Sequence, residues 1–394
     1  MRILIKNGTV IDTSPSVTVS ERTDVLIDGE RIEAVGPRLS SDDCAEVVDA
    51  TGMLVLPGFV DSHRHTWQAS YRAIVADDDL ETYFRVVLGE LAPAVTPEAA
   101  RAANLAGARE CLDSGVTTLL DWTHLTRTPE HTDALVEALQ ASGIRAVLGY
   151  CPTPEDTDAR RARDAHVGGL LTMAIAALGP EIVGEEQALA EWRLARELDL
   201  PVSVHLGITS AERTRSTMEF LQANGLFDRP ITHIHAIHYS DDDFKRVADT
   251  GGSVSVSPAG EQILGMGHPP TGRAAAAGAP VSFSADTVTC GPGDMFSLMR
   301  AAYALERGRG NGAFTTRDVL RMATIDGART VGLGDVTGSL TPGKQADLIL
   351  LRTDTPGMSG LQDPVGGVVL NADTSTVDTV LVAGRFRKRE GRLL

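Results

Sequence analysis

Two histidines one residue apart, His63 and His65, close the apolar run LVLPGFV in the segment GFVDSHRHTWQ. Alternate residues of a strand point to the same face, so both imidazoles can face one metal ion. Taken alone, a His-x-His pair is more often an ordinary pair of core or surface histidines. The pair therefore gains meaning only if further ligand residues end neighbouring strands.

Further ligand residues do end later apolar runs. PVSVHL ends with His205, ITHIHAI contains His235, and PVSFSAD ends with Asp286. Three histidines with one aspartate suit Zn²⁺, with Fe²⁺ and Mn²⁺ as alternatives, and leave a position for water. Such a water has a lowered pKa and is the natural nucleophile. The expected metal ligands are His63, His65, His205 and Asp286.

The middle of the chain must position these residues. It alternates short β-rich runs with amphipathic, Ala-rich stretches; the strand candidates are VLPGFVDSH, VTTLLDWTH, IRAVLGY, LTMAIAAL, PVSVHL, ITHIHAI, GSVSVSP and PVSFSAD. This alternation predicts an α/β protein with a (β/α)₈ TIM barrel, whose catalytic groups lie at the C-terminal ends of the strands. A doubly wound sheet is the structural alternative, but no G-x-G-x-x-G follows any strand.

Both chain ends show a different sequence pattern, in which short β-rich runs are separated by turn residues. ILIKNGTVID and VLIDGERIEAVG contain Asn-Gly and Asp-Gly between alternating apolar residues, which favour hairpins. GSLTPGKQADLILLRTD and VDTVLVAGRFRKREGRLL resemble them. We expect one small β-sandwich domain formed by residues 1–54 and 339–394, with the barrel domain over residues 55–338.

Composition excludes several classes of protein. The net charge of −17 over 394 residues opposes nucleic acid or an anionic membrane as a partner. The four cysteines are scattered without a C-x-x-C pair, which argues against a disulfide framework or a cysteine zinc site. The start of the chain lacks the pattern of a secretory signal and no run is long and apolar enough for a membrane span, so we expect a cytoplasmic protein.

Four separated motifs carry a family resemblance: PGFVDSHRHT, the strand-end His205, THIHAIHYSDDD and SADTVTCGPGDMFSLMR. In this order they resemble the amidohydrolase superfamily, most closely its cytosine, guanine, chlorotriazine and adenosylhomocysteine deaminase-like branch. The resemblance covers nearly the whole chain and implies a mononuclear site, since LTMAIAAL lacks the lysine that bridges two metals in binuclear relatives. It also implies that His235 polarises the substrate or contacts the hydrolytic water, and that the protein is a dimer or tetramer.

One departure from this resemblance affects the chemistry. Deaminases of the branch carry a glutamate three residues after the histidine of the fifth strand, where it shuttles a proton to the ring nitrogen. Here the stretch reads His205-Leu206-Gly207-Ile208, and the side chain of Ile208 cannot move protons.

The remaining candidates for catalysis and substrate binding follow from position alone. Asp286 can act as the general base beside the metal. Glu261 would supply a second catalytic carboxylate, since it follows the seventh strand, where deaminases more typically show Pro-x-Ser-Asn. The expected substrate contacts are Trp67, Arg72, His124 and His268.

These residues predict an enzyme with a small-molecule substrate. The first interpretation is a metal-dependent hydrolase that breaks a non-peptide C–N bond, by deaminating a cyclic amidine or amino-heterocycle or by opening an amide. The loss of the glutamate at Ile208 favours amide or C–halogen hydrolysis over ring deamination. A lyase such as a decarboxylase on the same scaffold and a non-catalytic binding protein are further alternatives.

Overall fold

The computed structural model describes residues 2–153 and 158–394. These residues form two compact units. One unit contains the chain up to Val60, together with Arg109–Thr118 and Asp294–Leu394; the other contains Asp61–Ala108 and Leu119–Gly293. No helix among the described residues has the length and apolarity needed to cross a membrane.

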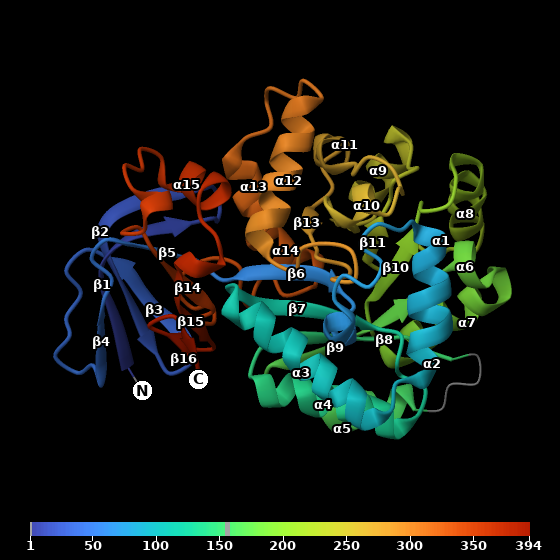
Figure 1. The fold of residues 1–394 in the computed structure, drawn as a ribbon, viewed down its shortest axis with the longest axis horizontal. Coiled ribbons are helices and arrows are strands. Elements are labelled where there is room, and N and C mark those ends of the chain that lie inside the picture. Colours follow the sequence, from blue (N-terminus) through green and yellow to red (C-terminus); the bar gives the residue numbers. More distant parts are fainter. Residues whose placement is uncertain (1, 154–157) are drawn as a thin grey trace. The chain divides into compact units, whose positions relative to one another are not determined.

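Eight strands form one barrel sheet in chain order, and those from β8 to β13 pair in parallel (Figure 1). Seven of the eight lie within the runs that the sequence indicates and β6 extends one residue beyond its run, so the predicted (β/α)₈ barrel is confirmed. The strands are buried along nearly their whole length, because both faces of a parallel sheet in a barrel are covered. The strands are β6 (Phe59–Arg64), β7 (Val116–Thr123), β8 (Arg145–Tyr150), β9 (Leu171–Ala177), β10 (Val202–Leu206), β11 (Ile231–His235), β12 (Ser253–Val256) and β13 (Val281–Phe283).

The barrel closes at the residues expected to bind metal. Arg64 and Asp286 form a parallel bridge between the first strand and the segment after the last. The backbone N–H of Asp286 donates to the carbonyl of His63 at 3.0 Å, and the N–H of His65 donates to the carbonyl of Asp286 at 2.8 Å. Closure of the barrel therefore sets the aspartate between the two histidines of the His-x-His pair.

Helices alternate with these strands, as the Ala-rich amphipathic stretches predict. Helix α4 packs on β8, α7 on β9 and α9 on β12. Between β6 and β7 the chain also forms an eight-residue π-helix, Phe84–Leu91, a rare conformation that is frequent at functional sites. The helices are α1 (Leu80–Tyr83), α2 (Ala92–Ala94), α3 (Pro97–Asp113), α4 (Pro129–Ser142), α5 (Ala159–His166), α6 (Pro180–Val183), α7 (Glu185–Leu198), α8 (Ala211–Ala223), α9 (Asp241–Asp249), α10 (Gly260–Ile263) and α11 (Thr271–Ala276).

The two ends of the chain build one mixed sheet of nine strands, which confirms a separate β-domain formed from both termini. Its apolar core includes Ile3, Val25 and Leu348 from distant parts of the chain. The strands are β1 (Arg2–Asp12), β2 (Thr18–Asp28), β3 (Arg31–Gly36), β4 (Glu46–Asp49), β5 (Met53–Pro57), β14 (Leu348–Arg352), β15 (Val377–Val382), β16 (Arg385–Arg389) and β17 (Arg392–Leu393). The same unit contains α12 (Met295–Gly308), α13 (Thr316–Met322), α14 (Ile325–Thr330) and α15 (Pro364–Leu370).

Of the two expected hairpins, the one at Asp28-Gly29 joins antiparallel β2 and β3 and is confirmed. The hairpin at Asn7-Gly8 is wrong, because β1 continues through both residues with an irregular register against β2. A Cβ at Gly8 would lie 2.6 Å from Cγ2 of Val55 on the adjacent β5. The glycine therefore permits the close approach of a neighbouring strand and does not make a turn.

Candidate active site

His63, His65 and Asp286 form the centre of the site. Nε2 of His63 lies 3.2 Å and Nε2 of His65 lies 3.3 Å from the same oxygen, Oδ1 of Asp286. His63 and His65 belong to alternate positions at the end of β6, so both rings face inwards. The three residues are buried and offer ligand atoms within 4.8 Å of one another.

His205 and His235 join this centre from the ends of β10 and β11. Their ligand atoms and one of His63 also lie within 4.8 Å of one another. The ring centroid of His63 lies 4.8 Å from that of His205 and 5.8 Å from that of His235. The ends of β6, β10 and β11 and the segment after β13 thus bring four imidazoles and one carboxylate together, as strand-end positions predict.

The backbone is strained at two of these residues. His235 has a φ of 71° and Asp286 a φ of 56°, in the left-handed region that few non-glycine residues adopt. Residues held in this conformation cost free energy and cluster at functional sites. The turns that follow β11 and β13 therefore aim these two side chains at the centre.

Burial and hydrogen bonding put the ligand residues in the forms that bind metal. Burial lowers the pKa of His63 to about 3 and the pKa of His205 well below its usual value. Burial works against ionisation of Asp286, but hydrogen bonds from His63 and His65 outweigh it and hold its pKa well below the usual range. Neutral imidazoles beside an ionised carboxylate are the ligand set that zinc prefers.

The contacts of the two ring nitrogens of His65 indicate whether a cation fits between His65 and Asp286. Its Nδ1 lies 2.7 Å from the carbonyl oxygen of Trp122, so Nδ1 carries the proton and donates it. Nε2 faces Oδ1 of Asp286 at 3.3 Å, so the space between these two atoms takes either a proton, in a hydrogen bond, or a metal ion. A carbonyl that fixes the tautomer of a ligand histidine is also the usual outer partner at metal sites. The donor set therefore fits a divalent ion.

Glu261 lies behind His235. Its Oε1 lies 2.9 Å from Nδ1 of His235 and accepts the backbone N–H of Ser257 at 2.7 Å. Burial alone would lower the pKa of His235, but the hydrogen bond to Glu261 outweighs it and raises that pKa. The carboxyl of Glu261 is fully buried and does not line the cavity beside the histidines. It can act only through His235.

That cavity has a volume of about 270 Å³ and is lined by His65, His205, His235 and Asp286 at its polar end. His124 also lines it, with its ring centroid 4.4 Å from that of His65. The substrate contact expected at His124 thus has the required position.

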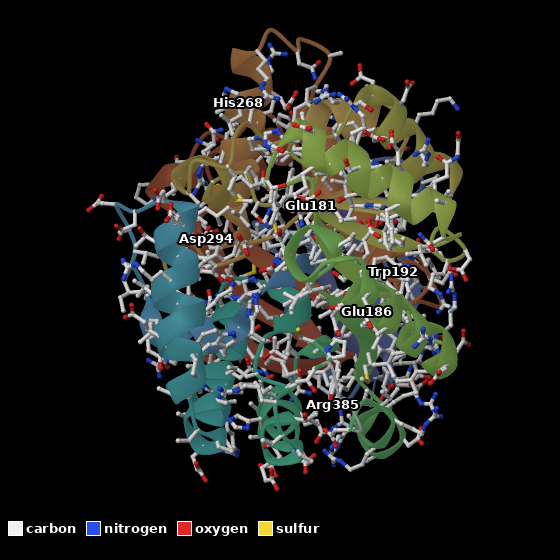
Figure 2. All side chains as sticks on the ribbon, turned by 90° about the vertical axis from the view of Figure 1, so that its right-hand side faces the viewer. Glu181, Glu186, Trp192, His268, Asp294 and Arg385 are labelled. Carbon is white, nitrogen blue, oxygen red and sulfur yellow. The ribbon has the colours of Figure 1, made fainter. Side chains whose placement is uncertain are left out.

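Three other expected substrate contacts lie elsewhere. Trp67 is 0% exposed and packs in an apolar cluster with Val87 and Leu125. Arg72 and His268 are exposed and do not line the cavity. In Figure 2, His268 lies towards the upper edge of the view and Glu181 near its centre.

Sequence reasoning missed several residues of the cavity wall. Glu181 lies four residues after the end of β9 and lines the cavity. The sequence feature that could have identified Glu181 is a carboxylate shortly after a strand end, at the end of the barrel where the histidines lie. Tyr83 at the end of α1 also lines the cavity, as do Phe84 and Leu88 of the π-helix, whose conformation no residue pattern predicted.

The barrel carries, at one end of its strands, a cluster of histidines and an aspartate that could hold a metal ion. Residues 54–387 match the amidohydrolase family, and the chain belongs to it. Together with its relatives, this membership confirms the expected class, a hydrolase that acts on non-peptide C–N bonds of small molecules.

The relatives match over nearly their whole length. The chain is 25% identical to a 5'-deoxyadenosine deaminase of Methanosphaera stadtmanae, covering 100% of this chain and 94% of the relative. It is 29% identical to a 5-methylthioadenosine/S-adenosylhomocysteine deaminase of Desulforudis audaxviator, covering 100% and 95%. Among solved structures, an adenosine deaminase from Xanthomonas campestris with bound zinc superposes with a TM-score of 0.91 at 25% identity, covering 100% and 94%.

Proposed function

We propose that this amidohydrolase binds one zinc ion and hydrolyses a C–N bond in a small cyclic molecule. The observation that carries the proposal is the approach of two imidazole nitrogens, Nε2 of His63 and Nε2 of His65, to the same oxygen of Asp286 at 3.2 and 3.3 Å, a buried geometry in which one divalent ion would replace the protons of both hydrogen bonds. The ligands would be His63, His65, His205 and Asp286. When bound, the ion supplies Lewis acidity, which makes water a nucleophile near neutral pH.

The side chains of the site then move the protons. Asp286 is ionised and can take a proton from the attacking water. The water oxygen adds to the ring carbon, the C–N bond breaks with its electron pair on nitrogen, and Asp286 returns the proton to that nitrogen. His235, held by Glu261, lies at the cavity wall and can donate a hydrogen bond to the oxygen that develops negative charge.

Hydrolysis of a C–halogen bond is a second candidate, and Ile208 favours it. The side chain of Ile208 lines the cavity at the place where deaminases of the family resemblance carry the proton shuttle. A halide leaves as an anion and needs no proton on departure, whereas a ring amine does. The water oxygen would replace the halide, and the released proton would pass through Asp286 to solvent.

One experiment tests the proposal and separates the two candidates. Amino-heterocycles, cyclic amides and halogenated rings are incubated with zinc-, iron- and manganese-loaded enzyme, and ammonia, halide and product mass are measured. We expect turnover with zinc that is lost in His63→Ala and Asp286→Asn. If those variants retained both their metal and their turnover, the metal-hydrolase proposal would be wrong.

A further inference from the structure

Away from the histidines, the cavity wall is apolar. The side chains that make this wall come from α1, the π-helix, the β9–α6 turn and the loops after β10 and β12. They include Leu80, Leu88, Leu178, Ile208, Leu264 and Met266. A ligand group that enters this region leaves water for an aliphatic surface, which is favourable only for apolar groups.

Among the residues that the structure describes, Glu181 is the one acidic side chain of this wall, and its hydrogen-bonding capacity is filled. Oε1 accepts the N–H of Gly207 at 2.8 Å and the hydroxyl of Thr214 at 3.3 Å. Oε2 accepts the N–H of Ile208 at 3.2 Å and the hydroxyl of Thr209 at 3.1 Å. A carboxylate has about four lone-pair sites. Glu181 therefore binds its own loop and has no site left for a substrate hydroxyl.

The cavity mouth is apolar as well. Phe84 at the start of the π-helix is 40% exposed and Ile182 on α6 is 42% exposed, and both line the cavity. Few large apolar side chains among the described residues are as exposed as these two. Exposed apolar side chains gathered at a cavity mark a binding surface for an apolar ligand.

The wall also lacks a counter-ion. Among the described residues, no lysine or arginine lines the cavity. A carboxylate or phosphate on the ligand would lose its hydration without gaining a cation, and ribose hydroxyls that lie against the aliphatic side chains of the wall would lack partners. Both losses penalise nucleosides and charged molecules.

We propose that the substrate is a neutral, compact ring with an alkyl or aryl substituent that lies against Ile208, Ile182 and Phe84. This inference rests on the proposed function, because the metal centre would hold the reacting end of the ring. It also gives the isoleucine at position 208 a role: the side chain completes the apolar wall that receives the substituent. The site then disfavours nucleosides such as those named for its relatives.

Alkyl hydroxamates test this proposal on the zinc-loaded enzyme. The hydroxamate end binds the metal while the alkyl tail contacts the apolar wall of the cavity. Calorimetry measures the Kd of each hydroxamate without any turnover. We expect the affinity to rise about fourfold for each methylene added to a short tail. Tails of equal length that end in a hydroxyl or a carboxylate should bind about tenfold more weakly or worse.

A variant at the cavity mouth tests whether the dependence of affinity on tail length arises at Ile182. Ile182→Asn should reduce the gain in affinity for each added methylene, because the substitution removes the isoleucine side chain that contacts the substituent. Ile74→Asn is the matched control, since Ile74 is 45% exposed and does not line the cavity. The control should keep the tail dependence of the wild-type enzyme.

Failure of this inference differs from failure of the proposed function. Hydroxamates that bind with one affinity whatever their tail, or prefer a carboxylate tail, would overturn the apolar substrate class and leave the metal centre intact. Absence of all hydroxamate binding to an enzyme that also retains no zinc would overturn both.

Discussion

The carboxylate of Glu261 lies 2.9 Å from Nδ1 of His235, on the side of the ring away from the cavity. A buried carboxylate in this position fixes the tautomer of the imidazole, so that Nε2 is the atom presented to the site. The pair belongs to two segments, the end of β11 and the start of α10. Glu261 is thus a positioning residue for His235.

Glu261→Gln should lower kcat by about 10- to 100-fold with a smaller change in KM, because outer partners of site histidines contribute to this extent. Glu261→Ala should lose more, since the amide of glutamine can still accept the N–H of His235. Steady-state kinetics across the working pH range measures both variants. A Glu261→Gln enzyme with full kcat at every pH would remove this carboxylate from the mechanism.

The fold and the histidine–aspartate cluster could be predicted because they depend on local patterns. Buried parallel strands read as apolar runs, and His205 and Asp286 end two of them. The barrel rule that functional groups lie at these ends then brings them together. The closure contact of Asp286 with the backbone of His63 shows why the rule works here.

The cavity wall could not be predicted, because it depends on how loops pack. Trp67 closely follows His63 and His65 in sequence, yet its ring is buried in an apolar cluster and does not line the cavity. In sequence, Glu181 is indistinguishable from an ordinary glutamate at the start of a helix. Only the tertiary fold brings its carboxylate to the backbone N–H groups of Gly207 and Ile208. The hairpin predicted at Asn7-Gly8 was wrong for the same reason, because contact with a neighbouring strand determines the conformation there.

Removal of the Glu181 carboxylate should loosen the loop that carries Ile208. Glu181→Ala leaves the N–H groups of Gly207 and Ile208 without their partner, at a cost of about 1–3 kcal/mol for each buried group. We expect a lower free energy of unfolding in urea and a higher KM. Glu181→Gln should be milder because its carbonyl oxygen still accepts one N–H. Unchanged stability of Glu181→Ala would contradict the anchoring role.

Gly107 on α3 should not tolerate a methyl group. A Cβ there would lie 2.7 Å from both the carbonyl oxygen and Cγ2 of Thr66, the residue after His65. Alanine favours a helix over glycine by about 1 kcal/mol, but this overlap should cost about 1–3 kcal/mol and dominate. Thermal unfolding of Gly107→Ala should therefore show a lower Tm. Gly308→Ala, which meets open space on α12, is the control and should not lose stability.

Glu191 should make stability fall as the pH rises. Its carboxyl on α7 is buried and accepts the N–H groups of Leu178 and Gly179 at 3.0 and 3.1 Å, next to the segment that carries Glu181. Burial raises its pKa from 4.5 to about 7, although these hydrogen bonds oppose the shift. Between these two values the folded protein holds a proton that the unfolded chain has lost, so the free energy of unfolding decreases with pH.

Glu191→Gln removes this titration and should flatten the pH dependence. The shift corresponds to about 3 kcal/mol lost by the wild type as the pH rises from 4.5 to about 7. The glutamine variant also loses a hydrogen bond, but that cost is the same at each pH and does not alter the slope. Urea unfolding at several pH values measures the difference, with the exposed Glu186→Gln on the same helix as control. Parallel curves for wild type and Glu191→Gln would show that this carboxyl does not carry the proton, because the other titrating groups are common to both proteins.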